Sequence, residues 1–228
     1  MTGDDLPRLR PVADHALLVD LASVRDEAAA ARVRALDAAL AADPAPGQVE
    51  VVPALVNLLI DFDPCVADHA TVAAHVRGLL SAPPVAPPPP VVHAVPFCPD
   101  PPFAPDLEEV ARRTGLSPGG VIAALTAAEY RVTMFGFAPG YAYLAGTPAA
   151  IALDRKPAPR RDVPAGSVIV AGAQALITAL TMPTGWWVLG RSPFALTTGD
   201  PARPYVLAVG DVVRFHRIPA AAMPGGAA

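Results

Sequence analysis

The stretch Glu129-Tyr-Arg-Val-Thr-Met-Phe-Gly-Phe-Ala-Pro-Gly-Tyr-Ala-Tyr-Leu-Ala-Gly146 places a turn of glycine and proline between two short apolar runs. Residues 130–135 predict a strand, because aromatic and β-branched side chains favour an extended backbone. Other short apolar segments follow, separated by glycine- and proline-rich turns: 167–171, 176–180, 186–189, 205–207 and 212–218. Such punctuated short strands predict a β-barrel or a β-sandwich.

Two helices and a strand are expected just before this region. Residues 91–96 predict a strand. Pro105-Asp-Leu-Glu-Glu109 resembles a helix start, with acidic residues where the helix dipole favours them, and Thr114-Gly115 ends that helix. Ser117-Pro118 predicts a second helix, running to about residue 128, with serine as the cap and proline in the first turn.

A proline-rich connector precedes the barrel region. In Ser81-Ala-Pro-Pro-Val-Ala-Pro-Pro-Pro-Pro90 the prolines lack a backbone donor and fix φ, which rules out a helix or a central strand. We therefore expect a stiff linker over 81–90 between a small domain over 1–80 and a larger one over 91–228.

The first domain alternates between strand and helix patterns. Strands are predicted at 16–21, 49–53 and 54–62, and helices at 24–42 and 66–80. The order βαββα predicts a small α/β sheet covered by helices on one face. The fold class is therefore α+β, with this sheet domain followed by the barrel.

Composition excludes several classes of function. The net charge of −4 and the lack of a basic stripe argue against nucleic acid as a partner. Apolar runs are too short for a membrane helix, although mean hydropathy is +0.39. The acidic N-terminus, with Asp4 and Asp5, does not resemble a signal peptide, so we expect a cytoplasmic protein. The five histidines are dispersed, and no metal site is expected.

Three blocks carry a family resemblance. They are residues 129–146, the run Pro159-Arg-Arg-Asp-Val-Pro-Ala-Gly-Ser-Val-Ile-Val-Ala-Gly-Ala-Gln174, and Gly185-Trp-Trp-Val-Leu-Gly-Arg-Ser-Pro193, followed by Val209-Gly-Asp-Val-Val-Arg-Phe215. Together these blocks resemble the allophanate hydrolase subunit 1 family. That family includes the B subunit of bacterial 5-oxoprolinase, the sporulation-kinase inhibitor KipI, and one lobe of the urea carboxylase carboxyltransferase domain.

The resemblance implies a fold, partners and a reaction. The fold is a C-terminal cyclophilin-like β-barrel beside a small α/β domain. The implied partner is an allophanate hydrolase subunit 2-family protein, joined in the 5-oxoprolinase version by a LamB/YcsF-family protein. There, ATP hydrolysis drives the opening of a lactam to glutamate. No phosphate-binding loop motif occurs in the chain, so we expect ATP at a shared surface or on a partner.

The glycine-rich turn is the first candidate for substrate binding. Gly136, Pro139 and Gly140 allow a ligand to approach the backbone closely. Tyr141 and Tyr143 add apolar faces and hydroxyl donors suited to a small planar amide. The alternative is a structural turn with core aromatic residues.

A basic loop is the second candidate. Arg160 and Arg161 follow Arg155 and Lys156 in a proline-rich segment. Guanidinium groups bind carboxylate or phosphate through paired hydrogen bonds, so this loop could hold a substrate carboxylate or an acyl phosphate formed from ATP. The alternative is a solvated charged loop.

Three further residues are assigned from their positions. Arg191 follows a strand and is the catalytic arginine candidate, unless it pairs with Asp154 or Asp211. Gln174 could bind an amide edge of the substrate, or close a turn as a buried amide. Glu129 could act as a general base if burial raised its pKa, whereas a carboxylate at a helix end is the alternative.

The function predicted on this basis is that of the B subunit in an ATP-dependent 5-oxoprolinase-type complex. The alternatives are a KipI-like inhibitor of a histidine kinase and a component of a urea carboxylase or allophanate hydrolase system. In each enzymatic case we expect one concave surface, lined by glycine and fringed by arginine, that a partner protein closes.

Overall fold

The computed structural model describes residues 6–224. Its contacts divide the chain into two compact units, Met1–Pro89 and Pro90–Ala228. Residues 83–91, which include most of the proline-rich run, form neither helix nor strand. None of the helices in the described part of the chain is long and apolar enough to cross a membrane.

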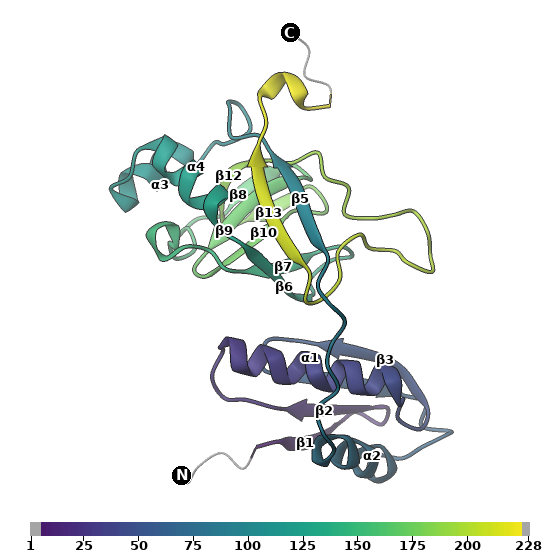
Figure 1. Ribbon diagram of the computed structural model, residues 1–228. Helices are drawn as coiled ribbons and strands as arrows, with labels where there is room; N and C mark the ends of the chain where they lie inside the picture. The colour runs from purple at the N-terminus through teal and green to yellow at the C-terminus, as the bar shows by residue number, and fades with distance from the viewer. Residues whose placement is uncertain (1–5, 225–228) are drawn as a thin grey trace. The chain divides into compact units, whose positions relative to one another are not determined.

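The first unit is a four-stranded antiparallel sheet with two helices (Figure 1). The strands are β1 (Arg8–Val12), β2 (Ala16–Asp20), β3 (Gln48–Pro53) and β4 (Asn57–Phe62), in the spatial order β1-β2-β4-β3. The helices are α1 (Glu27–Ala42) and α2 (His69–Ser81). Strand β1 was not predicted from the sequence. Four of its five residues are exposed, so it lacks a clear alternation between buried and exposed positions.

Alternating residues of this sheet build its core. Leu17 and Val19 of β2 and Leu58, Ile60 and Phe62 of β4 are buried on one face. They form one apolar cluster with residues of both helices. The predicted sheet with helices on one face is thereby confirmed.

Capping aspartates set the starts of these helices later than predicted. The side chain of Asp26 accepts a hydrogen bond from the backbone N–H of Ala29, and that of Asp68 from the N–H of Thr71. Each carboxylate satisfies a donor that the first helical turn leaves free. The helices therefore begin at residues 27 and 69 rather than at 24 and 66.

The second unit is built on a seven-stranded sheet (Figure 1). Its spatial order is β12-β9-β10-β7-β6-β13-β5. The strands are β5 (Val92–Phe97), β6 (Tyr130–Phe135), β7 (Ala142–Ala145), β9 (Ser167–Ala171), β10 (Gln174–Ile177), β12 (Trp187–Arg191) and β13 (Val212–Arg217). All neighbours are antiparallel except β13 and β5.

The two edges of this sheet meet and close it into a barrel. Cys98, just after β5, and Arg191, at the end of β12, exchange two backbone hydrogen bonds of 2.8 and 2.9 Å. Gly190 permits this approach, because a Cβ there would lie 2.2 Å from the Phe97 ring and 2.6 Å from the Cys98 carbonyl oxygen. The α+β class with a C-terminal barrel is therefore confirmed.

Side chains alternate between the two faces of the barrel wall. All seven strands contribute to one core, which also includes buried residues of α3 (Leu107–Thr114) and α4 (Pro118–Ala127). On β9, Val168 and Val170 join this core, whereas Ile169 and Ala171 join a second cluster on the opposite face. Burial on both faces explains the continuous apolar runs in the sequence.

Some of the predicted strands are wrong. Residues 205–207 form no strand; Tyr205 makes an isolated bridge with Thr197 and stacks on Phe135, and Leu207 is buried. The expected strand at 176–180 is instead β10, which begins at Gln174 and ends at Ile177. A two-stranded ribbon of β8 (Arg160–Val163) and β11 (Met182–Thr184) lies outside the seven-stranded sheet and was not predicted.

Candidate functional site

The turn between β6 and β7 is closed by its own backbone. The N–H of Gly136 donates to the carbonyl of Tyr141, and the N–H of Tyr141 donates to the carbonyl of Ala138. Gly140 has φ +76° and Phe137 has φ +73°. The left-handed conformation suits glycine but is unfavourable for phenylalanine, and Phe137 is 73% exposed. An exposed aromatic residue in a strained turn is typical of a functional position.

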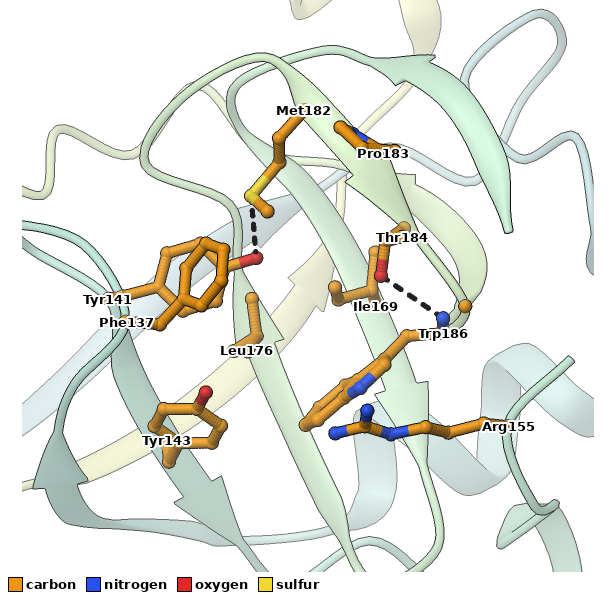
Figure 2. Close-up of a pocket in the computed structure, with 11 residues that line it drawn as sticks. Phe137, Tyr141, Tyr143, Arg155, Ile169, Leu176, Met182, Pro183, Thr184 and Trp186 are labelled. Carbon is orange, nitrogen blue, oxygen red and sulfur yellow. Dashed lines mark hydrogen bonds between the residues drawn. The ribbon is translucent and has the colours of Figure 1, made fainter. Parts of the chain in front are cut away.

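Next to this turn is an aromatic pocket of about 160 Å³ (Figure 2). Phe137, Tyr141 and Tyr143 lie on one side of it and Trp186 on the other. Its remaining lining residues are Arg155, Ile169, Leu176, Met182, Pro183, Thr184 and Gly185. Because Ile169 and Leu176 belong to the second cluster, the pocket lies on the face of the barrel wall opposite the main core.

Two contacts order the walls of the aromatic pocket. The hydroxyl of Tyr141 donates to the sulfur of Met182 over 3.2 Å, and burial raises the pKa of Tyr141 to about 12. The guanidinium of Arg155 lies 5.7 Å from the centroid of the Trp186 ring, within the range of a cation–π interaction. The pocket therefore offers flat apolar faces and one cation.

A second pocket, which we call the arginine pocket, has a volume of about 350 Å³. Three arginines line it, Arg160, Arg161 and Arg191. Its other lining residues are Pro102, Phe103, Pro105, Asp162, Val163, Pro164, Ser167 and Val188. The Nε of Arg191 donates to the carbonyl of Ala165 over 3.1 Å, so Arg191 pairs with neither Asp154 nor Asp211.

Asp106 is the buried carboxylate behind the arginine pocket. It accepts hydrogen bonds from Lys156 Nζ at 2.5 Å, from Arg160 at 2.8 Å and from the backbone N–H of Val188 at 2.9 Å. Burial by itself raises the pKa of this carboxyl, but the three hydrogen bonds together lower it below its ordinary value. Asp106 was interpreted from sequence as a residue favoured by the helix dipole, whereas its main partners lie about 50 and more residues away.

The ribbon of β8 and β11 stands between the two pockets. Met182 and Thr184 of β11 line the aromatic pocket, and Arg160 and Val163 of β8 line the arginine pocket. In the ribbon Met182 pairs with Val163, and Thr184 pairs with Arg160. The expected single concave surface is therefore divided into two neighbouring pockets.

The described residues contain no group of three or more histidine, cysteine, aspartate or glutamate side chains placed to hold a metal ion.

Comparison with known proteins identifies the family to which this barrel belongs. The family model described as "Carboxyltransferase domain, subdomain C and D" matches residues 7–207 of the chain. The chain belongs to this family. The resemblance carried by the three sequence blocks is thereby confirmed.

The chain is also similar to a named protein and to solved structures. It is 34% identical over 227 residues to the B subunit of 5-oxoprolinase from Bacillus subtilis strain 168, an alignment that covers 92% of each protein. The crystal structure of TTHA0988 matches with a TM-score of 0.78 and 35% identity, over 90% of this chain but 40% of that longer one. Urea carboxylase of Kluyveromyces lactis, at 16% identity and a TM-score of 0.69, shares the fold over 92% of this chain and 21% of its own.

Five predicted site residues line neither pocket: Glu129 and Gln174, and Gly136, Pro139 and Gly140 of the β6–β7 turn. Glu129, just before β6, forms an exposed ion pair with Arg214 at 2.6 Å. Its carboxylate is half exposed, so the burial on which the general-base hypothesis depended is not found. Gln174 begins β10, where it pairs with Ala145 and Ala171, and lines neither pocket.

Other predicted residues frame the aromatic pocket or enter it. Tyr141 and Tyr143 line it, whereas Gly136, Pro139 and Gly140 shape the adjoining turn. Sequence reasoning missed Phe137, Met182 and Trp186 as lining residues. The available signal for Trp186 was the pair of adjacent tryptophans: Trp187, the first residue of β12, joins the main core, whereas Trp186, just before the strand, joins the cluster on the opposite face.

Proposed function

We propose that this chain is the B subunit of an ATP-dependent 5-oxoprolinase-type complex, acting with a subunit 2-family partner on a lactam or small amide. The proposal is supported by the identity of 34% with a protein that is named as this component of 5-oxoprolinase, over 92% of both chains. A LamB/YcsF-family protein is the third component that we propose.

The aromatic pocket is the observation that carries the substrate assignment. A cavity of about 150 Å³ holds one benzene-sized ring, and the aromatic pocket has about 160 Å³. Tyr143 and Trp186 supply flat walls for a small ring. Arg155 at the same pocket can bind a carboxylate through two parallel hydrogen bonds. A five-membered cyclic amide with one carboxylate meets both requirements.

The proposed reaction activates an amide that resists water. The lactam oxygen attacks the terminal phosphorus of ATP, and ADP leaves. Water then adds to the activated ring carbon, and the carbon–nitrogen bond breaks so that the nitrogen leaves as the protonated amine and an acyl phosphate remains. A second water molecule hydrolyses this acyl phosphate to glutamate and inorganic phosphate. In this scheme the residues of the aromatic pocket orient the ring and hold its carboxylate. Fixed positive groups stabilise the charge that develops on the oxygens, because they are oriented before the reaction begins.

Reconstitution tests this function. The chain is mixed with its subunit 2-family and LamB/YcsF-family partners, and glutamate release is measured with 5-oxoproline and ATP. We expect turnover that depends on all three proteins. Arg155→Gln should raise KM for 5-oxoproline by about tenfold or more, because a charge-assisted contact is lost. Arg112→Gln is the matched control, since Arg112 is exposed on α3 and pairs with Glu109.

The outcome against the proposal is absence of glutamate release when all three proteins are folded and associated. The same assay tests the alternative function in a urea carboxylase or allophanate hydrolase system, because urea or allophanate can replace 5-oxoproline as the substrate. Turnover of either in place of 5-oxoproline would assign the chain to a urea carboxylase or allophanate hydrolase system. The likeness to urea carboxylase at 16% identity supports a shared fold and does not choose between these substrates.

A further inference from the structure

The arginine pocket has no part in binding the lactam as proposed above. Its volume of about 350 Å³ is more than twice the 160 Å³ of the aromatic pocket. Its wall combines β8, the end of β12 and the segment from Pro102 to Pro105. The pocket is therefore large enough for a ligand of its own.

Two of its three guanidinium groups are available to a ligand. Arg160 already forms an ion pair with Asp106, with 2.8 Å between its guanidinium nitrogen and the carboxylate oxygen Oδ1. Among the described residues, no carboxylate lies within 4.0 Å of the guanidinium nitrogens of Arg161 or Arg191. Arg191 is also oriented, because its Nε is fixed to the carbonyl of Ala165. Its terminal N–H groups make no hydrogen bond to the described residues.

The local charge balance favours a ligand with two negative charges. Three arginines and Asp162 line the pocket, and Asp106, which pairs with Arg160, brings Lys156 with it next to the pocket. The cations exceed the carboxylates by two charges. A phosphoryl group carries about −1.5 to −2 at neutral pH, whereas a carboxylate carries one charge. Guanidinium groups also match the oxygens of a phosphoryl group through paired hydrogen bonds.

The ligand of this pocket is a molecule separate from the ring in the aromatic pocket. The β8–β11 ribbon lies between the two sites, and neighbouring strands are about 4.8 Å apart. A small lactam that contacts Tyr143 and Trp186, with its carboxylate at Arg155, lies wholly on the aromatic-pocket side of this ribbon. The anion must therefore come from a second molecule.

We propose that the arginine pocket binds a phosphoryl group, with Arg161 and Arg191 as its direct ligands and Asp106 as the residue that positions Arg160. Assigning that group to ATP, or to the phosphate it releases, rests on the proposed function. Binding of a phosphoryl group does not, because all the cations belong to this one chain.

Isothermal titration calorimetry on the full chain tests this proposal. Inorganic phosphate, pyrophosphate and ATP are the phosphoryl probes, and acetate and 5-oxoproline are the carboxylate probes. We expect one site for phosphoryl probes, with affinity that falls as ionic strength rises. Arg191→Gln and Arg161→Gln should each weaken binding by about tenfold or more, because each removes a charged donor.

Two control variants distinguish phosphate binding in the arginine pocket from non-specific attraction to other arginines. Arg112→Gln, on the exposed face of α3, and Arg155→Gln, in the aromatic pocket, should leave phosphate affinity unchanged. Circular dichroism melting curves establish that each variant is folded. Should Arg112→Gln reduce affinity as much as Arg191→Gln, the binding is non-specific and the proposal fails.

Two other results would overturn the inference. One is no heat of binding for any phosphoryl probe at millimolar concentration with the folded wild-type chain. The other is tighter binding of acetate than of phosphate, with loss in Arg191→Gln, which would make the pocket a carboxylate site. Phosphate binding without glutamate release in the reconstituted complex would retain the inference while the proposed function fails.

Discussion

Asp106, at the start of α3, accepts a hydrogen bond from Arg160, on β8, over 2.8 Å between its Oδ1 and the guanidinium nitrogen. Its other oxygen accepts from Lys156 and from the backbone N–H of Val188. One buried carboxylate thus joins a helix, the β8–β11 ribbon and a barrel strand. Lys156 also neighbours Arg155 in sequence, so the same carboxylate holds the loop that lines the aromatic pocket.

Asp106→Asn should lower the free energy of unfolding by about 3 kcal/mol at neutral pH, because it leaves the largely buried ammonium of Lys156, and the partly exposed guanidinium of Arg160, without their charged partner. Urea denaturation measures this change. Glu109→Gln, which alters an exposed carboxylate on the same helix, is the control and should have a much smaller effect. Equal effects of the two substitutions would show that Asp106 has no special structural role.

Wild type and Asp106→Asn should also differ in their response to pH. The pKa of Asp106 is lower in the folded chain than its ordinary value. Its carboxylate therefore stabilises the fold above the unfolded pKa of about 4, and this stabilisation is lost as pH falls through the folded pKa. The difference in unfolding free energy between the two proteins should be constant from about pH 5 to 7 and shrink below about pH 4. A difference that grows on acidification would contradict this.

Closure of the barrel at Gly190 gives a second test. In Gly190→Ala the new Cβ would lie 2.2 Å from the Phe97 ring, and the backbone of β5 and β12 would have to separate. We expect a loss of about 3 kcal/mol in unfolding free energy, at the upper end of what overpacking a core costs, because backbone as well as side chain must move. Gly119→Ala, in the first turn of α4, has only the Ser117 hydroxyl nearby, at 3.9 Å, and should be neutral or slightly stabilising.

The sequence pattern predicted those strands that are determined by residues close to one another in the chain. Residues 130–135 and 167–171 were predicted as strands with the observed bounds, because their apolar runs are bounded by turn residues. The ribbon strand β8 was missed, because its sequence Arg-Arg-Asp-Val is charged and its first three residues are exposed. An exposed strand outside the main sheet shows no alternation that a pattern could detect.

Pockets were harder to predict than strands, because they depend on distant pairings. Arg191 and Arg160 were both singled out, but their shared pocket depends on barrel closure and on the attachment of Arg160 to Asp106. Asp211, one expected partner of Arg191, is occupied by His93 at 2.9 Å. The positive φ of Phe137 is likewise a tertiary property, since a sequence indicates this conformation reliably only at glycine.

Tyr141→Phe tests the buried hydroxyl of the aromatic pocket. Burial raises the pKa of Tyr141 to about 12, so the neutral phenol is favoured by the fold. Its contribution to stability is present below the unfolded pKa of about 10 and is lost as pH rises toward 12. In a spectrophotometric titration, Tyr141→Phe should lose absorbance change near pH 12 and leave the change at lower pH as it is in wild type. A loss confined to the lower range would place Tyr141 in solvent.

Phe137→Asn separates stability from ligand binding at the β6–β7 turn. Phenylalanine at φ +73° carries strain of about 1–2 kcal/mol, which asparagine relieves in part because it tolerates the left-handed region. The substitution should not lower the unfolding free energy, since Phe137 is 73% exposed, and should raise it by up to about 1 kcal/mol.

The same substitution should weaken binding of 5-oxoproline in the reconstituted complex, because one aromatic wall of the pocket is removed. Urea denaturation and KM for 5-oxoproline measure the two effects separately. Destabilisation with unchanged KM would mean that Phe137 serves the fold, and that the strain in the turn has no connection with the pocket.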